Sequence, residues 1–218
     1  MQIEMAGLDR RQLHVLLGSA IVPLPIALIS TVGADGTHNA APFSLTFPIC
    51  WKPPIICVSI GLRRGPEGQK KDTLANIESS HDFVVNIMDE SMMKPTIQTS
   101  LEYPGSVDEI KEAGLTAVAA EKVKSPRIVE AQVSFECQVV QEFELGEGEN
   151  LKGIVLGEVV VTHVKDELWV DGGIDPAKLR SVGRLGFGFY CGTRDIIEIP
   201  WRKGSPEPRP LPKGAEKA

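Results

Sequence analysis

The chain has 218 residues, of which 42% are hydrophobic and 24% are charged. These proportions are typical of globular domains and exclude disorder over the whole chain, and the length suits one domain with a sizeable core. The net charge of −6 excludes a general nucleic-acid-binding surface, although local anion sites built from backbone amides remain compatible with it. Residues 201–218 carry five Lys or Arg and two Glu, so residues 1–200 are more acidic than the whole chain.

We expect neither a disulfide framework nor a targeting segment. No two cysteines form a Cys-x-x-Cys pair, so zinc and redox-dithiol motifs are absent and buried structural thiols are expected. Segment 1–12 carries four charged residues before any apolar run, unlike a signal peptide. Pro23 and Pro25 interrupt the apolar-rich segment 13–32, which is not expected to span a membrane, and a cytoplasmic location follows as the default expectation. The cysteines are Cys50, Cys57, Cys137 and Cys191.

The first elements predicted along the chain are a helix and a β-hairpin. Asp9 is a good N-cap for a short helix through Leu17, with Gly18 as its stop. Segment 26–32 is rich in β-branched residues and predicts a strand. A Gly-rich turn at 33–36 then returns the chain through 37–41, which completes a hairpin.

The middle of the chain alternates strands with short helices. Segment 55–60 is mainly apolar and predicts a strand buried on both faces. After a polar loop, Asp72 and Thr73 begin a helix that should reach about residue 80, and 83–87 reads as a strand. Ser106-x-x-Glu109 fits a capping box, so a helix is expected to residue 113, ending at Gly114.

The second half of the chain is predicted to be mainly β. Segments 133–140 and 154–164 read as the arms of a long antiparallel hairpin around a turn at 146–150. Strands therefore dominate and no βαβ rhythm is present, which predicts an antiparallel barrel or sandwich with helical insertions in a single domain over residues 1–200. The Pro- and Lys-rich tail, 201–218, is expected to be disordered.

Motifs for acid–base, nucleotide or metal chemistry are missing. The four histidines stand in no ligand spacing, so no metal site is expected and each histidine is interpreted as structural or exposed. Segment 183–188 has its glycines in the wrong order for a dinucleotide fingerprint. Segment 65–73 is unlike a phosphate loop, because Asp72 stands where that motif needs Ser or Thr directly after Lys.

Two patterns remain as candidate binding sites. Lys71, Asp72 and Thr73 lie at a predicted helix N-terminus beside Arg63 and Arg64, where free amides and the helix dipole favour a phosphate. Simple helix capping by Asp72 or Thr73 explains the same residues. The small residues of 39–44 at a strand end would admit a flat ligand, but an ordinary strand-to-loop exit fits them as well.

Several segments, taken in order, resemble the flavin reductase-like family, the FMN-binding split barrels that include flavoredoxin. Their order and spacing, more than any single piece, carry the resemblance. Leu24 stands where many relatives have Arg, and 186–190 is more aromatic than usual, so no role is assigned to Leu24, Phe187 or Phe189. The matching segments are 21–31, 39–44, 53–61, 71–77, 83–86, 113–116, 126–128, 136–137 and 183–186.

The resemblance implies a mainly β fold with short helices, an antiparallel six-stranded split β-barrel. It also implies an FMN cofactor at a homodimer interface, with the flavin ring against 41–44 and 57–59 and the phosphate on 71–73. The residues implied to bind FMN are Thr31, Asn39, Ala41, Pro42, Phe43, Ser44, Cys57, Val58, Ser59, Gly61, Arg63, Lys71, Asp72 and Thr73.

The missing catalytic motifs agree with a flavoprotein, because the flavin itself carries the hydride. The sequence thus predicts an FMN-binding oxidoreductase, either a flavin reductase using NAD(P)H or a flavoredoxin-type carrier with an electron-transfer partner. No protein catalytic residue, nucleic acid or membrane partner is expected. There are two alternatives. One is a non-catalytic flavin-binding protein that acts as a sensor or a store, and the other is a split barrel without flavin that has a structural role.

Overall fold

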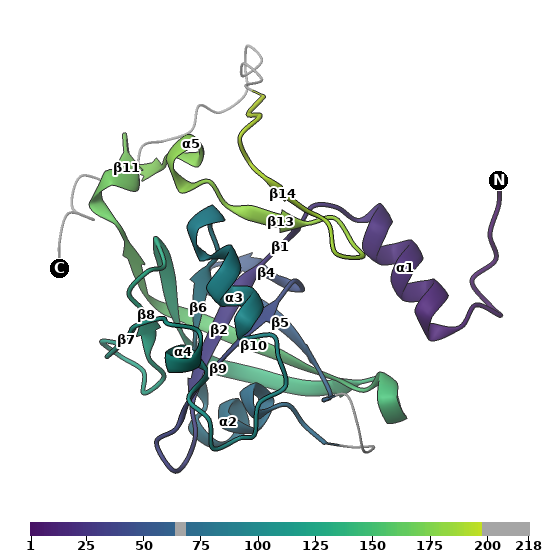
Figure 1. Ribbon diagram of the computed structural model, residues 1–218, viewed down its shortest axis with the longest axis horizontal. Helices are drawn as coiled ribbons and strands as arrows, with labels where there is room; N and C mark the ends of the chain where they lie inside the picture. The colour runs from purple at the N-terminus through teal and green to yellow at the C-terminus, as the bar shows by residue number, and fades with distance from the viewer. Residues whose placement is uncertain (64–68, 198–218) are drawn as a thin grey trace.

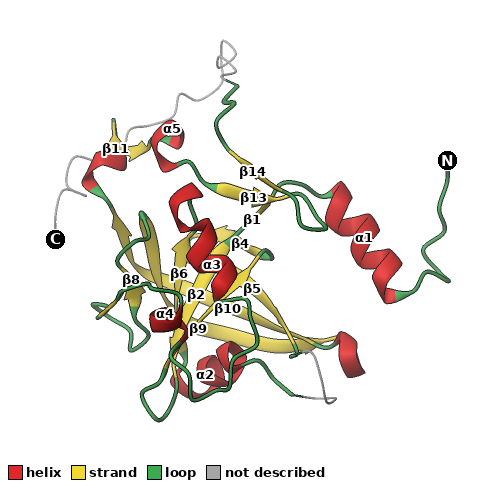
Figure 2. Cartoon of the chain, viewed as in Figure 1, coloured by secondary structure: helices red, strands yellow, loops and turns green. Residues whose placement is uncertain are grey.

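Runs of β-branched and apolar residues form a seven-stranded antiparallel sheet that curls around a core (Figures 1 and 2). The computed structural model describes residues 1–63 and 69–197. The strand order is β3-β2-β6-β9-β10-β5-β4, and the edge strands β3 and β4 do not pair with each other. The strands are β2 (Ala27–Val32), β3 (His38–Phe43), β4 (Thr46–Trp51), β5 (Pro54–Gly61), β6 (Asp82–Ile87), β9 (Val133–Leu145) and β10 (Lys152–Val164).

Both predicted hairpins are confirmed. Ala27 pairs with Phe43 in the β2–β3 hairpin, and Val133 pairs with Val164 at the base of the long β9–β10 arm. The sequence prediction missed β4, which gives the sheet a seventh strand beyond the six expected. Pro48 lies inside β4 and most of the strand is exposed, as an edge strand tolerates.

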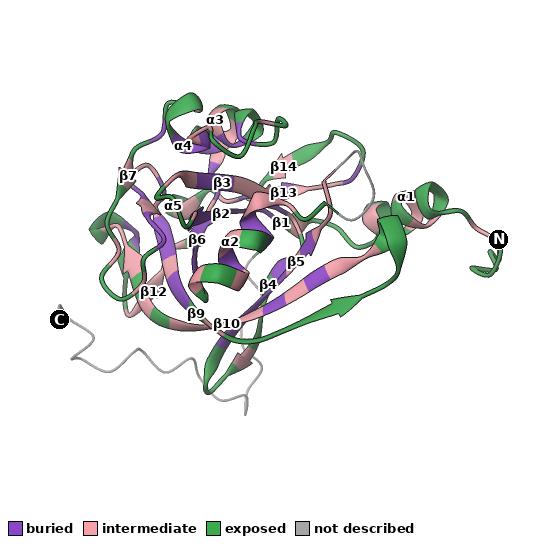
Figure 3. Ribbon diagram, turned by 90° about the horizontal axis from the view of Figure 1, so that it is seen from below, coloured by how far each residue is buried: buried purple, intermediate pink, exposed green. Residues whose placement is uncertain are grey.

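Side chains of the sheet pack into two cores, one on each face. Along β2, Ile29 enters a core with Phe83 of β6, whereas Leu28 enters the other with Ile110. This alternation explains why β2 is buried almost throughout. In Figure 3 the buried residues gather where the central strands meet, and the far end of the β9–β10 arm is exposed.

Five helices and several short ladders surround the sheet in the described residues. One small sheet, β1-β13-β14, lies beside the α1 end of the chain (Figure 1). The helices are α1 (Arg10–Ala20), α2 (Asp72–Ser80), α3 (Met93–Gln98), α4 (Glu109–Glu112) and α5 (Pro176–Leu179). The short strands are β1 (Leu24–Pro25), β7 (Ala117–Val118), β8 (Arg127–Ile128), β11 (Trp169–Val170), β12 (Gly173–Ile174), β13 (Val182–Arg184) and β14 (Tyr190–Gly192), and the 3₁₀ turns are η1 (Glu90–Met92), η2 (Gly148–Asn150) and η3 (Asp166–Leu168).

The predicted helices are present, but three of their end signals are corrected. Asp9 caps α1 in a capping box, yet the helix continues past Gly18 to Ala20. Asp108, instead of Ser106, caps α4 by accepting from the amide of Lys111. Gly114, at φ +69°, follows α4 as predicted. The third correction, at the start of α2, bears on the candidate site.

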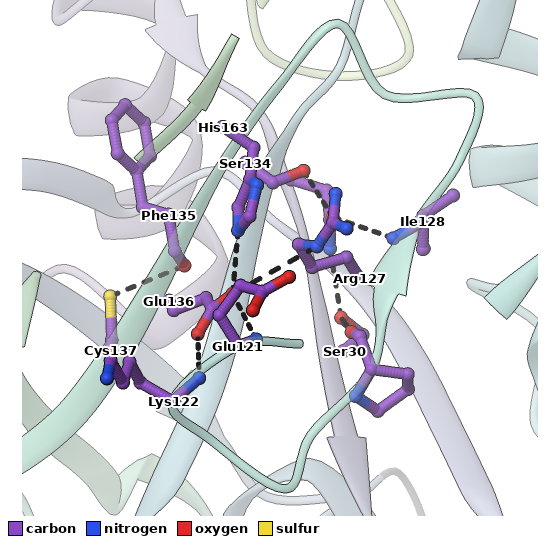
Figure 4. A network of polar contacts seen from close by, with 12 residues as sticks. Ser30, Glu121, Lys122, Arg127, Ile128, Ser134, Phe135, Glu136, Cys137 and His163 are labelled. Carbon is purple, nitrogen blue, oxygen red and sulfur yellow. Dashed lines mark hydrogen bonds and ion pairs between the residues drawn. The ribbon is translucent and has the colours of Figure 1, made fainter. Parts of the chain in front are cut away.

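Buried carboxylates hold the segment between β7 and β8 against the sheet. Glu136 of β9 accepts hydrogen bonds from the amides of Glu121 (2.8 Å) and Lys122 (2.7 Å), and Nε2 of His163 lies 2.6 Å from Oε1 (Figure 4). Asp82 of β6 accepts from the amide of Ser125 (3.1 Å). These charge-assisted contacts satisfy backbone donors that would otherwise be unpaired.

The expectation of buried structural cysteines is met in part. All four thiols are free, and Cys57 and Cys137 are buried whereas Cys50 and Cys191 are half-buried. Burial raises the pKa of both Cys57 and Cys137, which keeps these two thiols protonated and unreactive.

Candidate functional site

A cavity of about 810 Å³ lies between the start of α2, the end of β3, α3 with the loop after it, and the small sheet. This volume falls in the range of pockets that hold cofactors, roughly 300–1,000 Å³. At the α2 end, Lys71 and Arg63 contribute positive charge to the cavity lining. Apolar side chains such as Met88 and Met93 also line the cavity.

Most of the residues predicted to bind FMN meet at this cavity. They come from two segments that are far apart in sequence, β3 and the start of α2, which the fold brings together. Thr31 lies just behind them, buried, with its hydroxyl donating to Oδ1 of Asn39 (3.2 Å). The predicted residues that line the cavity are Asn39, Ala41, Pro42, Ser44, Arg63, Lys71, Asp72 and Thr73.

The other predicted residues do not line the cavity in the chain by itself. Phe43 and Val58 belong to the hydrophobic core cluster. Cys57 is buried and Ser59 is half-buried on the other face of β5, and Gly61 ends that strand opposite Lys152. Arg64 lies outside the described residues. Flavin contacts for these residues stay predictions.

The start of α2 is not capped by its own side chains. Lys71 occupies the N-cap position with an extended backbone and makes no side-chain cap hydrogen bond. Asp72 forms an ion pair with Arg63, and Thr73 donates its hydroxyl hydrogen to Oδ1 of Asn39 (2.9 Å). The capping interpretation of Asp72 and Thr73 is therefore wrong, and the first-turn amides of α2 receive no side-chain acceptor from these three residues.

Lys71 brings a cation to the same place. Its Nζ lies 5.5 Å from the centroid of the Phe43 ring, so a cation–π contact helps to position the ammonium group. Together with the helix dipole and the uncapped amides, this charge makes the α2 end suitable for a phosphate. The hydroxyl of Thr73 is not a free donor there, because it is already committed to Asn39.

Glu109 of α4 is a cavity residue that sequence reasoning missed. Its side chain is only 7% exposed, and Oε2 accepts from Nδ2 of Asn39 (2.5 Å) and from the amide of Ala40 (2.9 Å). Burial raises the pKa of this carboxyl to about 7, with a further contribution from the negative charge of Asp72. Glu109 and Asn39 thus fix the start of β3 against α4 and α2.

The residues present fit a flavin that carries a phosphate. The cavity is large enough, its α2 end offers a helix N-terminus and the cation of Lys71, and its small residues Ala41 and Ser44 leave room for a flat ring. In the described residues no cluster of His, Cys, Asp or Glu could hold a metal ion. Within the same residues, no helix combines the length and hydropathy needed to cross a bilayer.

Comparisons with known proteins agree on one family. The family model described as "Flavin reductase like domain" matches residues 18–177. The protein BH2278 of Halalkalibacterium halodurans is 36% identical to this chain over 192 residues, which cover 87% of this chain and 91% of that protein.

Solved structures show the same architecture. Nitrilotriacetate monooxygenase component B from Bacillus cereus matches with a TM-score of 0.86 and 29% identity, covering 91% of this chain and 98% of that one. A flavin reductase structure with a split barrel domain from Shewanella frigidimarina matches with a TM-score of 0.78 and 23% identity, covering 93% and 100% of the two chains. At that identity the likeness concerns the fold alone, and it confirms the predicted split-barrel fold.

Proposed function

The chain belongs to the flavin reductase-like family, and on this premise we propose that it is an oxidoreductase that holds FMN in the cavity and exchanges electrons with NAD(P)H or with a redox protein. The family supports a flavin cofactor. The choice of FMN and the identity of the electron donor are parts of the proposal. When bound, the flavin supplies the hydride-accepting chemistry, so the chain needs no acid–base pair of its own.

The uncapped start of α2 is the observation that carries the choice of a phosphate-bearing flavin. The first three residues of this segment, Lys71 to Thr73, line the cavity, the helix start has no side-chain cap, and Asp72 is already paired with Arg63. An anionic group gains charge-assisted hydrogen bonds there. The chain therefore binds the phosphate at α2, while Ala41, Pro42 and Ser44 leave space for the rest of the molecule.

An enzymatic role is favoured over a storage or structural role. A relative that is 29% identical over almost its whole length is named as a component of a monooxygenase, which is an oxidation enzyme. Tyr103 and Tyr190 add polar groups to a cavity that still has an apolar part, as expected for a pocket that receives a second molecule.

Absorption spectroscopy tests the proposal directly. The purified protein, incubated with FMN and passed through a desalting column, should retain the visible flavin spectrum. Addition of NADH or NADPH without oxygen should then bleach that spectrum in multiple turnovers when free FMN is supplied.

Three other outcomes narrow or overturn the proposal. Retained flavin that only a reduced protein partner can bleach would identify a flavoredoxin-type carrier. Retained flavin that no physiological donor reduces would identify a sensor or storage protein, and failure to retain any flavin would overturn the proposed function.

A further inference from the structure

The cavity has a second end whose chemistry the flavin phosphate does not explain. The small sheet contributes Arg184 of β13 and Tyr190 of β14 to the lining, and these two residues are cross-strand partners. Figure 1 shows α2 at the bottom of the molecule and the small sheet at the top, with α3 between them. The end at Arg184 is thus separate from the phosphate end at Lys71.

Arg184 differs from the other arginines of the cavity in its partners. Arg63 pairs with Asp72, and Nη1 of Arg10 lies 3.6 Å from Oε2 of Glu149. Across residues 1–63 and 69–197, no ion pair or side-chain hydrogen bond involves the half-buried Arg184. A guanidinium group that lines a cavity and pairs with no protein carboxylate is suited to binding an anionic ligand. Its planar fork of N–H donors matches the geometry of a carboxylate or phosphate.

A second polar group in the cavity lining also lacks a partner. Thr96 of α3 lines the cavity and is only 1% exposed, and its Oγ1 is buried without a hydrogen-bond partner. Buried hydroxyls nearly always have a partner, so this group indicates a place for a ligand atom or a water. Ile26 and Met93 supply apolar surface beside it.

We propose that Arg184, together with Tyr190 and Thr96, binds one anionic group, a carboxylate or a phosphate, of the second substrate. One guanidinium and one phenol hydroxyl suit one such group. That this molecule exchanges electrons with the flavin rests on the proposed function; the anion site itself does not.

Calorimetry with small probes tests the site without turnover. Benzoate and its neutral isostere benzamide are titrated into the protein with and without FMN. Benzoate should bind roughly tenfold or more tightly than benzamide, the range expected for charge-assisted hydrogen bonds. Arg184→Ala should abolish this preference, whereas Arg180→Ala, at an exposed arginine that does not line the cavity, should preserve it. FMN affinity should be unchanged in both variants.

Further arms identify the source of the anion. A rise of tenfold or more in the apparent KM for NADH in Arg184→Ala, with competition between benzoate and inorganic phosphate, would assign the site to a phosphate. Loss of benzoate binding with an unchanged KM for NADH would assign it to a carboxylate.

The remaining outcomes separate this site from the proposed function. Arg184→Lys keeps the charge but loses the planar fork, so an intermediate loss is expected, and this variant serves if Arg184→Ala does not fold. Equal binding of benzoate and benzamide by the wild type, or a preference that survives Arg184→Ala, would overturn the site. Preferential benzoate binding by a protein that retains no flavin would instead uphold the site and overturn the proposed function.

Discussion

At the scale of single residues, Lys71 gives the sharpest test of where the flavin phosphate binds. If its ammonium group contacts the phosphate, the contact contributes about 1.5–3 kcal/mol. Lys71→Ala should therefore weaken FMN binding by roughly 10- to 150-fold. Riboflavin lacks the phosphate, so its affinity should hardly change. Quenching of flavin fluorescence measures both affinities.

Lys70→Ala is the matched control for this prediction. Lys70 is the adjacent lysine, but its Nζ lies 2.5 Å from Oε1 of Glu78 and it does not line the cavity. Its removal should leave both flavins bound as before. Equal losses for FMN and riboflavin in Lys71→Ala, or no loss for either, would place the phosphate elsewhere.

Glu109 should make stability depend on pH. Its pKa is about 7 in the folded chain against an ordinary value of 4.5, so the folded state favours the protonated form. The difference in free energy of unfolding between the wild type and Glu109→Gln should therefore be most favourable to the wild type below pH 4.5. This difference should fall by at most about 3 kcal/mol as the pH rises through about 7.

Urea unfolding of both proteins at pH 5 and pH 8 measures this effect. The comparison with Glu109→Gln separates the titration of Glu109 from that of the charged groups around it. These groups are Asp72, Arg63 and Lys71, Asp108 before α4, and His38 of β3, whose Nδ1 lies 3.7 Å from Oδ2 of Asp108. A stability difference between the two proteins that is the same at both pH values would refute the assignment.

The sequence could identify part of this site and not the rest. Lys71, Thr73 and Asn39 belong to short segments with recognisable patterns. Glu109 matched a capping box, and nothing local distinguishes a carboxylate that caps its own helix from one that reaches a strand. Its bond to Asn39 joins residues 70 positions apart, which only the assembled fold specifies.

At the scale of elements, the segment between β7 and β8 depends on carboxylates of neighbouring strands. Glu136→Gln keeps the shape of the side chain but replaces one acceptor oxygen with an NH₂ group. One buried donor among the amides of Glu121 and Lys122 and the His163 ring then loses its acceptor. The expected loss of stability is about 1–3 kcal/mol.

Chemical denaturation measures that loss, and hydrogen exchange should locate it at the amides of Glu121 and Lys122. Glu142→Gln is the same change on an exposed part of β9 and should alter stability by less than about 0.5 kcal/mol. A comparable loss in both variants would show that the buried contacts are not the cause.

Elements with strong periodicity were predictable, and those defined by tertiary contact were not. The β-branched run of β2 and the alternation in β9 predicted both hairpins. The edge strand β4 contains Pro48 and exposes most of its residues, so it lacks a buried periodic face. The six residues of α3 are too few to show helical periodicity.

At the scale of the whole molecule, the tail is proposed to be dispensable. Residues 201–218 have a composition too rich in proline and charge to build a core. A chain that ends after Trp201 should therefore keep its thermal midpoint within about 2 °C and should bind FMN as the full chain does, although the tail lies outside the described residues. A lower midpoint or the loss of soluble protein would show that the tail packs against the domain.

The exposed apolar face of β4 predicts that two copies of the chain associate. Phe47, Ile49 and Trp51 are 45%, 50% and 83% exposed, and together they form an apolar edge of a kind that usually marks an interface. The strand begins two residues after Ser44, which lines the cavity. A second copy that covers β4 would therefore also cover the rim of the proposed flavin site.

Light scattering of the flavin-loaded protein at micromolar concentration should return about twice the chain mass of 23.7 kDa. The double change Phe47→Ser and Trp51→Ser should shift the protein to the monomer and weaken FMN binding, because both the interface and the cover of the rim are lost. Trp169→Ser alters a tryptophan of β11 that is 40% exposed and lies outside β4, so it should change neither mass nor affinity. A wild-type mass near that of one chain, with flavin bound, would show that the site is complete without a partner.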